Sequence, residues 1–269
     1  MVFYFTGTGN SLYAARMLDD DCRSIPQAIH DADKTYRADR IGIACPVYGH
    51  EVPQMVRAFI RDAAFETDYF YMVLTYGNRH GGAVELAEQM LAQTGKRADY
   101  ITTLLMVDNF LPGFDMEEQV RTAPEKQIDA QLARIRQDID AKKRWTQPVT
   151  DEDRAAHQEY LSRPARITAI DPSALYRVTE DCIGCGICMK VCPAGCISVR
   201  NGRAVHENGG CQLCMACIHH CPQNAIQLTI PEKNPKARFQ NEHVKLMDIV
   251  HANWQEERCI CQWKTAVNA

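Results

Sequence analysis

The chain lacks a hydrophobic run long enough to cross a membrane. Its longest apolar stretch is about "YFYMVL" (69–74), whereas a spanning helix needs roughly 20 such residues. It also lacks an excess of basic charge. The 30 Lys and Arg against 34 Asp and Glu give a formal charge of -4 and a pI near 6.1, and nucleic-acid-binding domains are typically basic. We therefore expect no membrane span and no nucleic-acid partner.

We also expect no secretory leader, because residue 2 already begins a pattern typical of a strand. Cysteine, in contrast, is plentiful. Nine of the 13 cysteines fall between Cys182 and Cys221. Regularly spaced cysteines without a secretory leader indicate metal binding rather than disulfides. The expected location is the reducing cytoplasm.

The first 145 residues alternate apolar runs typical of buried strands with segments of helical periodicity. The expected strands are Val2–Thr6, Arg40–Val47, Tyr69–Tyr76, Ile101–Val107 and, more weakly, Cys22–Ile29. The expected helices are Ser11–Leu18, Pro53–Ala64, Gly82–Thr94 and Pro124–Lys143. This order predicts an α/β fold, a doubly wound five-stranded parallel sheet with helices on both faces.

The composition changes after residue 145. The polar stretch 144–164 reads as a linker with a short helix. From about 175, cysteines, tight turns and short strands predict a small α+β domain, with a hairpin at 197–205 turning at Asn201-Gly202. A helix is expected in "NEHVKLMDIVHANW" (241–254). The predicted divisions are 1–145, a linker 146–174, a second domain 175–232 and a C-terminal helix and tail 233–269.

Residues 182–197 and 211–226 repeat each other with an offset of 29, which implies two equivalent sites. Each repeat has the spacing C-x2-C-x2-C-x3-C-P, the bacterial [4Fe–4S] pattern in which the fourth cysteine of each run binds the other cluster. We assign one cluster to Cys182, Cys185, Cys188 and Cys221, and the other to Cys211, Cys214, Cys217 and Cys192. The alternative is a structural zinc site.

The remaining cysteines fit simpler roles. Cys196 stands where the second repeat has Ala225, so we expect a small buried side chain. Cys22 and Cys45 lie on expected strands and belong to the core. Cys259 and Cys261 have the wrong spacing for a cluster loop, and their role stays open.

The stretch "TGTGNS" lies between the first expected strand and the first expected helix, where backbone N–H groups bind anions. A Walker loop would need a lysine here, and Leu12 stands where a dinucleotide fingerprint needs its third glycine. The flavodoxin loop T/S-x-T-G-N-T/S matches throughout, over Thr6, Gly7, Thr8, Gly9, Asn10 and Ser11. No basic residue follows until Arg16, which suits a monophosphate ester.

On these motifs the front of the chain resembles flavodoxin and the back resembles two-cluster ferredoxin. Together they are similar to the flavodoxin–ferredoxin fusion proteins of anaerobic bacteria. The resemblance implies FMN, with its ring between the loops "PVYGHEVP" (46–53) and "TYGNRHGG" (75–82). The implied ring contacts are Pro46, Val47, Tyr48, Gly49, Thr75, Tyr76, Gly77, Asn78, Gly81 and Gly82. A surface-packed Tyr48 and a plain strand-to-helix turn remain alternatives.

His50 and His80 fall on these loops and are the candidate proton donors, although solvated loop residues are the simpler reading. Arg79 is a further candidate, to steady an anionic reduced flavin. In "DNFLPG" (108–113), Asp108 and Asn109 fit a turn or a helix entry. His219 and His220 replace no cysteine of the pattern, so no ligand role is expected for them.

Flavin and clusters in one chain imply conversion between one-electron supply and two-electron chemistry. No nicotinamide fingerprint is present. We expect electrons from a low-potential partner, a ferredoxin or a ferredoxin-reducing enzyme, to reach FMN through the clusters and reduce a small organic acceptor. The alternative is an electron carrier without substrate chemistry of its own.

Overall fold

The computed structural model of the chain describes residues 1–163, 172–207 and 209–255. These residues form two compact units that are not separated by a single cut in the sequence. The first unit comprises Met1–Phe5, Asn10–Val107 and the residues from Thr122 to 163. The second comprises Thr6–Gly9, Asp108–Arg121 and the described residues from 172 onward. The linear domain boundaries at 145, 174 and 232 stay a prediction.

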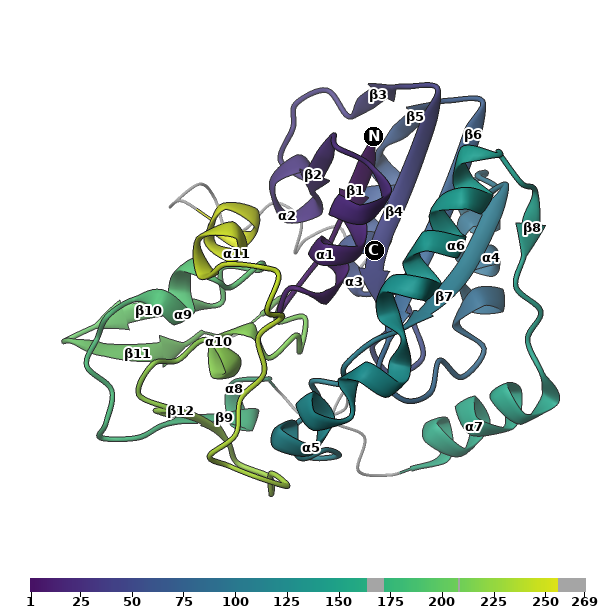
Figure 1. The fold of residues 1–269 in the computed structure, drawn as a ribbon. Coiled ribbons are helices and arrows are strands. Elements are labelled where there is room, and N and C mark those ends of the chain that lie inside the picture. The colour runs from purple at the N-terminus through teal and green to yellow at the C-terminus, as the bar shows by residue number, and fades with distance from the viewer. Residues whose placement is uncertain (164–171, 208, 256–269) are drawn as a thin grey trace. The chain divides into compact units, whose positions relative to one another are not determined.

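The first unit is built on a six-stranded parallel sheet (Figure 1). Its strands, in spatial order, are β2 (Cys22–Ser24), β1 (Val2–Tyr4), β4 (Arg40–Pro46), β6 (Tyr69–Tyr76), β7 (Tyr100–Leu105) and β8 (Trp145–Thr146). The first five follow the 2-1-3-4-5 order of doubly wound folds, which is compatible with a flavodoxin-like fold. The parallel α/β prediction is therefore confirmed, but the count of five strands is wrong. Trp145 pairs with Tyr100 and adds a sixth strand at the edge.

Two other local predictions need correction. The weak strand expected over Cys22–Ile29 ends at Ser24, because a short helix, α2 (Ile25–Ala28), starts there with a proline in its first turn. The pairing of β3 (Thr35–Arg37) with β5 (Ala64–Glu66) in a separate two-stranded sheet was not predicted. Both strands are only three residues long, too short for a period-two pattern to stand out.

Helices cover both faces of the sheet. They are α1 (Asn10–Leu18), α3 (Gln54–Asp62), α4 (Ala83–Gln93) and α6 (Ile128–Asp140). Figure 1 shows α1 and α6 on one face and α3 and α4 on the other. The helix expected over Pro124–Lys143 is divided into a 3-10 turn (Ala123–Lys126) and α6, because Gln127 adopts a left-handed conformation with φ 48°.

The register of the central strands depends on one close contact. Gly42 of β4 pairs with Tyr71 of β6, and a Cβ on Gly42 would overlap the Tyr71 ring. Only glycine leaves room for this ring, which is fully buried. The Tyr71 ring of β6 thus packs where β4 has a glycine, and this contact helps to set the register of the two strands.

The segment expected as a linker with a short helix contains a helix of 12 residues, α7 (Asp151–Ser162). It starts with a capping box, in which the Thr150 hydroxyl accepts from the amide of Asp153 and the Asp153 carboxylate accepts from the amide of Thr150. None of its residues is buried. Polar contacts, rather than an apolar face, therefore attach α7 to the rest of the first unit.

The second unit contains a duplicated strand–helix–strand motif. Its elements are β9 (Tyr176–Val178), α9 (Ile187–Lys190) and β10 (Ile197–Arg200), then β11 (Arg203–His206), α10 (Ala216–His219) and β12 (Ile226–Leu228). Strand β9 pairs antiparallel with β12, and β10 with β11. The predicted hairpin is confirmed, with positive φ at Asn201 (51°) and Gly202 (71°) as a type I′ turn requires.

Further segments complete the second unit. They are α5 (Met116–Arg121), α8 (Pro172–Leu175), α11 (Leu246–Asn253) and the loop Thr6–Gly9. The predicted C-terminal helix is confirmed as α11. Its fully buried Asn253 donates from Nδ2 to the carbonyls of Thr6 (2.9 Å) and Val191 (3.1 Å). No helix within the described residues combines the length and the apolar character needed to span a membrane.

Candidate metal centres and cofactor loops

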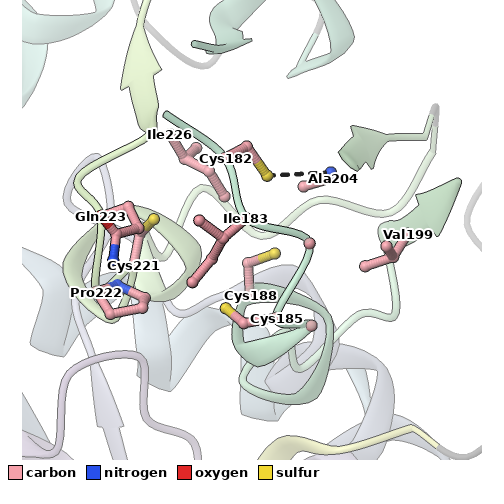
Figure 2. Close-up of a pocket in the computed structure, with 12 residues that line it drawn as sticks. Cys182, Ile183, Cys185, Cys188, Val199, Ala204, Cys221, Pro222, Gln223 and Ile226 are labelled. Atoms are coloured by element: carbon pink, nitrogen blue, oxygen red, sulfur yellow. Dashed lines mark hydrogen bonds between the residues drawn. The ribbon is translucent and has the colours of Figure 1, made fainter. Parts of the chain in front are cut away.

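Two pockets in the second unit are lined by cysteines. The first contains Cys182, Cys185, Cys188 and Cys221. Figure 2 shows these four side chains around it: three come from α9 and the loop that precedes it, and the fourth follows α10. The other residues that line the pocket are uncharged: Ile183, Gly184, Gly186, Val199, Ala204, Pro222, Gln223 and Ile226.

The second pocket repeats this arrangement. It contains Cys192, Cys211, Cys214 and Cys217. Tyr176 and His206 also line it, with their rings stacked at 4.5 Å between centroids. The structure thus brings the eight cysteines together in the two groups of four that the crossed pattern predicts.

Backbone amides point at several of these sulfurs. Cys192 Sγ and Cys221 Sγ each accept from the amide four residues later, at 3.3 Å from Cys196 and 3.2 Å from Ala225. Cys182 Sγ accepts from Ala204 (3.4 Å; Figure 2), and Cys211 Sγ from Leu213 (3.4 Å). Such bonds favour the thiolate, the form that binds metal.

The pKa values of two cysteines in the second pocket are also shifted in favour of the thiolate. A hydrogen bond from the Cys196 thiol, together with those from His206 and the Leu213 amide, lowers the pKa of Cys211 to about 5, against the opposing effect of burial. The Cys196 thiol also lowers the pKa of the buried Cys192. Cys196 itself is buried, as expected, and its thiol donates to the Gly209 carbonyl (3.1 Å). Cys45 is buried in β4, and Cys22 is only half-buried in β2.

The spacing of the ligands separates the two metal readings. Among the described residues, no three His, Cys, Asp or Glu side chains lie close enough to hold one metal ion. Zinc draws four sulfurs to about 2.3 Å from a single point, whereas a cubic cluster needs its ligands spread around a cavity. Four thiols spread around one pocket are the arrangement that a cubic cluster needs. Cys259 and Cys261 lie outside the described residues.

The glycine-rich loop Thr6–Gly9 is buried within the second unit. Thr6 Oγ1 accepts from the Gly9 amide (3.1 Å), and Thr8 Oγ1 accepts from Asn109 Nδ2 (3.0 Å). Each hydroxyl therefore keeps its own proton to donate. Within the described part of the chain, the amides of Gly7 and Thr8 donate no hydrogen bond. Buried N–H groups without acceptors are the usual mark of a missing anion or water.

The loop also rests on the cysteine-rich segment. A Cβ on Gly7 would lie 2.7 Å from the carbonyl oxygen of Cys214, so the two backbones are in contact. Asn109, expected in a turn, is tied to His219 of α10 by a 2.9 Å hydrogen bond. His219 Nδ1 accepts from the Phe239 amide (3.1 Å), so Nε2 is the donor to the Asn109 carbonyl. Burial lowers the pKa of His219 to about 3 and keeps this ring neutral.

Asn10 and Ser11, which continue the glycine-rich motif in the first unit, both have hydrogen-bond partners. Asn10 Nδ2 donates to the Val107 carbonyl (2.9 Å), and the hydroxyls of Ser11 and Thr75 are 2.8 Å apart. The predicted ring contacts follow the ends of β4 and β6: Pro46, Val47, Tyr48, Gly49, Thr75, Tyr76, Gly77, Asn78, Gly81 and Gly82. Tyr48 packs edge-on to Phe5.

Helix α7 lies against these two loops, which the sequence did not reveal. A Cβ on Gly49 would lie 2.6 Å from the Tyr160 hydroxyl, and His50 Nδ1 is 3.4 Å from His157 Nδ1. His80 is buried and reaches Asp153 through Nε2 (3.5 Å), while its Nδ1 has no partner within the described residues. His80 is therefore not a solvated loop residue and His50 is half-buried, but neither has a shown chemical role.

Comparisons with known proteins concern the cysteine-rich segment. Residues 181–226 match the model of the 4Fe-4S dicluster domain. The chain is 49% identical over 47 residues to a component of an ion-translocating oxidoreductase complex of Methanosarcina acetivorans, which is 18% of each chain. It is 36% identical over 70 residues to an uncharacterised ferredoxin of Methanocaldococcus jannaschii, covering 24% of this chain and 88% of the ferredoxin.

A third similarity is to the putative electron transport protein YsaA of Escherichia coli, 35% identical over 69 residues, or 23% of this chain and 44% of that protein. The chain thus spans less than half the length of two of these three relatives. No solved structure matches the chain.

Proposed function

Since the C-terminal part of this chain is a 4Fe-4S dicluster domain, through which the chain belongs to the ferredoxin family, we propose that the two cysteine pockets each hold one [4Fe–4S] cluster. Cys182, Cys185, Cys188 and Cys221 bind the first, and Cys192, Cys211, Cys214 and Cys217 bind the second. The single observation that supports this best is the division of the eight thiols between two separate pockets. Each cluster supplies one-electron transfer.

The proposal extends to FMN. Its phosphate would be bound by Thr6, Gly7, Thr8 and Gly9, with Asn10 and Ser11 following in the motif. Two buried amides without acceptors and two hydroxyls with free protons suit an anion. When bound, FMN supplies exchange between one-electron and two-electron chemistry. The loops after β4 and β6 would contact its ring, and a glycine such as Gly77 would let the backbone approach it.

With both cofactors the protein would be an oxidoreductase. A low-potential partner, a ferredoxin or a ferredoxin-reducing enzyme, would supply electrons, and a small organic acceptor would receive them. The buried His80, whose Nε2 lies 3.5 Å from Asp153, is the candidate proton donor to that acceptor. The free thiols of the described cysteines are consistent with a reducing cytoplasm.

A second candidate is an electron carrier without substrate chemistry. The specific observation in its favour is that similar proteins include a ferredoxin and a putative electron transport protein. An anaerobic redox titration, following flavin absorbance and cluster EPR together, separates the candidates. Direct two-electron reduction with little semiquinone supports the oxidoreductase. A semiquinone stable over a wide potential range supports the carrier.

The first test measures the cofactor content of the protein. Anaerobically purified protein should contain about eight iron atoms and eight sulfides per chain, together with one FMN. Thr8→Ala should weaken FMN binding and leave the cluster absorbance unchanged, because it removes a hydroxyl that faces the proposed anion. Thr229→Ala is the matched control, since Thr229 Oγ1 only donates to the Ala174 and Leu175 carbonyls. Unchanged flavin content in Thr8→Ala would contradict the loop assignment.

A further inference from the structure

The two cysteine pockets are equivalent by sequence repeat but not by electrostatic surroundings. Arg238 and Glu232 form a buried ion pair in the second unit, at 3.0 Å between Nη1 and Oε2. Their side chains are only 10% and 3% exposed. Both residues lie beyond Ile226, the last residue of the second repeat. The repeat itself therefore supplies no matching ion pair to the other pocket.

Hydrogen bonds hold the segment around Arg238 against the residues on either side of Cys221. Asn224 Nδ2 donates to the Pro235 carbonyl (2.7 Å) on one side. On the other, the Phe239 amide donates to His219 Nδ1 (3.1 Å) and Gln240 Nε2 to the His219 carbonyl (2.9 Å). Since His219 and Asn224 flank Cys221, this segment runs past the fourth cysteine of the first pocket.

The guanidinium is incompletely paired. Its Nη1 donates to the Ala237 carbonyl (2.8 Å) and lies near Glu232, but its Nε and Nη2 have no acceptor among the described residues. Burial lowers the pKa of Arg238, while Glu232 and the negative charge of the Cys221 thiolate act in the opposite direction. An arginine retains its charge in proteins, so the segment that runs past Cys221 carries a buried cation with unused donors.

We infer that Arg238 makes the site of Cys182, Cys185, Cys188 and Cys221 the more easily reduced of the two. The inference rests on the proposed function, in which both pockets hold [4Fe–4S] clusters. Reduction adds one electron, and hence one negative charge, to a site whose own lining is uncharged. A buried cation stabilises that added charge, because burial weakens its screening by water. Glu232 opposes the effect and limits its size.

The test is an anaerobic EPR redox titration of the full chain with both clusters present. Arg238→Gln should shift the midpoint of the first cluster to lower potential by a tenfold change in the equilibrium constant, ~59 mV for one electron. Glu232→Gln should shift it upward, since it leaves the cation unopposed. Arg238→Lys keeps the charge and should retain most of the wild-type midpoint.

The second cluster serves as the internal control and should move much less in every variant. Its signal is distinguished from the first by Cys185→Ser, which should perturb only the first. A structural role for the ion pair would move both midpoints, or move them in the same direction in Arg238→Gln and Glu232→Gln. Either result would overturn the inference. If Arg238→Gln does not assemble its clusters, the upward shift in Glu232→Gln still decides.

Failure of the proposed function would give a different experimental result. Wild-type protein with no cluster signal, or with far fewer than about eight iron atoms, would refute the cluster assignment before any midpoint is measured. Eight iron atoms with midpoints that are insensitive to both charges would refute only the role of Arg238.

Discussion

The backbone of Gly7 lies directly on that of Cys214. A Cβ on Gly7 would be 2.7 Å from the Cys214 carbonyl oxygen and 3.2 Å from its Cβ. The loop that the sequence marks for anion binding and a cysteine of the second pocket are therefore packed together within one compact unit. A change at either residue should be felt at the other.

Gly7→Ala tests this contact. The added methyl group meets backbone rather than a flexible side chain, so either the loop or the Cys214 turn must move, at a cost of about 1–3 kcal/mol. We expect a changed EPR signal from the second cluster and weaker flavin binding, with the first cluster unaffected. Gly95→Ala is the control for a methyl group that meets nothing within 4 Å; its positive φ (69°), which Gly7 lacks, adds only local backbone strain in the first unit. Equal effects on both clusters would contradict the prediction.

The crossed assignment of the fourth cysteines can be tested by combining substitutions. Cys185→Ser with Cys188→Ser should abolish the first cluster and leave about four iron atoms per chain. Adding Cys221→Ser should then cause no further loss, because Cys221 lines that same pocket. Adding Cys192→Ser instead should abolish the remaining cluster. Iron analysis and EPR give the answer, and the reverse pattern would show that each run binds its own fourth cysteine.

Asn253 should be important for stability. Its amide satisfies the carbonyls of Thr6 and Val191 in a fully buried position. Asn253→Asp keeps the shape but replaces both donors with an acceptor. We expect a loss of about 2–4 kcal/mol, from two buried carbonyls without partners and a buried carboxylate. The melting temperature of the full chain under anaerobic conditions measures it. Asn201→Asp, at the exposed hairpin turn, should cost little.

His50 should titrate far below its usual range. Burial, and then the neighbouring His157, lower its pKa from 6.5 to about 4. Because the folded-state value lies below the unfolded one, the unfolded chain binds the proton more readily. The neutral ring thus favours folding above about pH 6.5, and this contribution is lost as the pH falls towards 4.

The measurement is an NMR titration of histidine-labelled protein between pH 5 and 8. The His50 resonance should stay nearly constant over this range, and His50→Asn identifies it by its loss. Asparagine is the suitable replacement because His50 has φ 71°, a left-handed conformation that asparagine tolerates. A midpoint near 6.5 would mean that α7 does not bury the ring in solution.

The local chemistry could be predicted from the amino-acid sequence alone. Apolar runs such as Tyr69–Tyr76 indicated buried parallel strands, since a strand covered on both faces needs no polar side. The spacing of the eight cysteines indicated two groups of four, because a short loop can direct three thiols at one cluster and a distant fourth can complete the other. Asn201-Gly202 indicated its turn through its preference for positive φ.

Contacts between residues far apart in sequence were decided only by the tertiary structure. Strand β8 has two residues, too few for any periodicity, and exists because β7 offers an open edge. Helix α7 has no buried face, so its pattern resembled a linker, and its place depends on His157 and Tyr160 reaching the loop of His50. Glu232 and Arg238 lie after the second cysteine repeat in the sequence, so the repeat did not indicate their ion pair. The inferred difference between the two cysteine sites depends on the burial of this pair, because a charge removed from water is less screened.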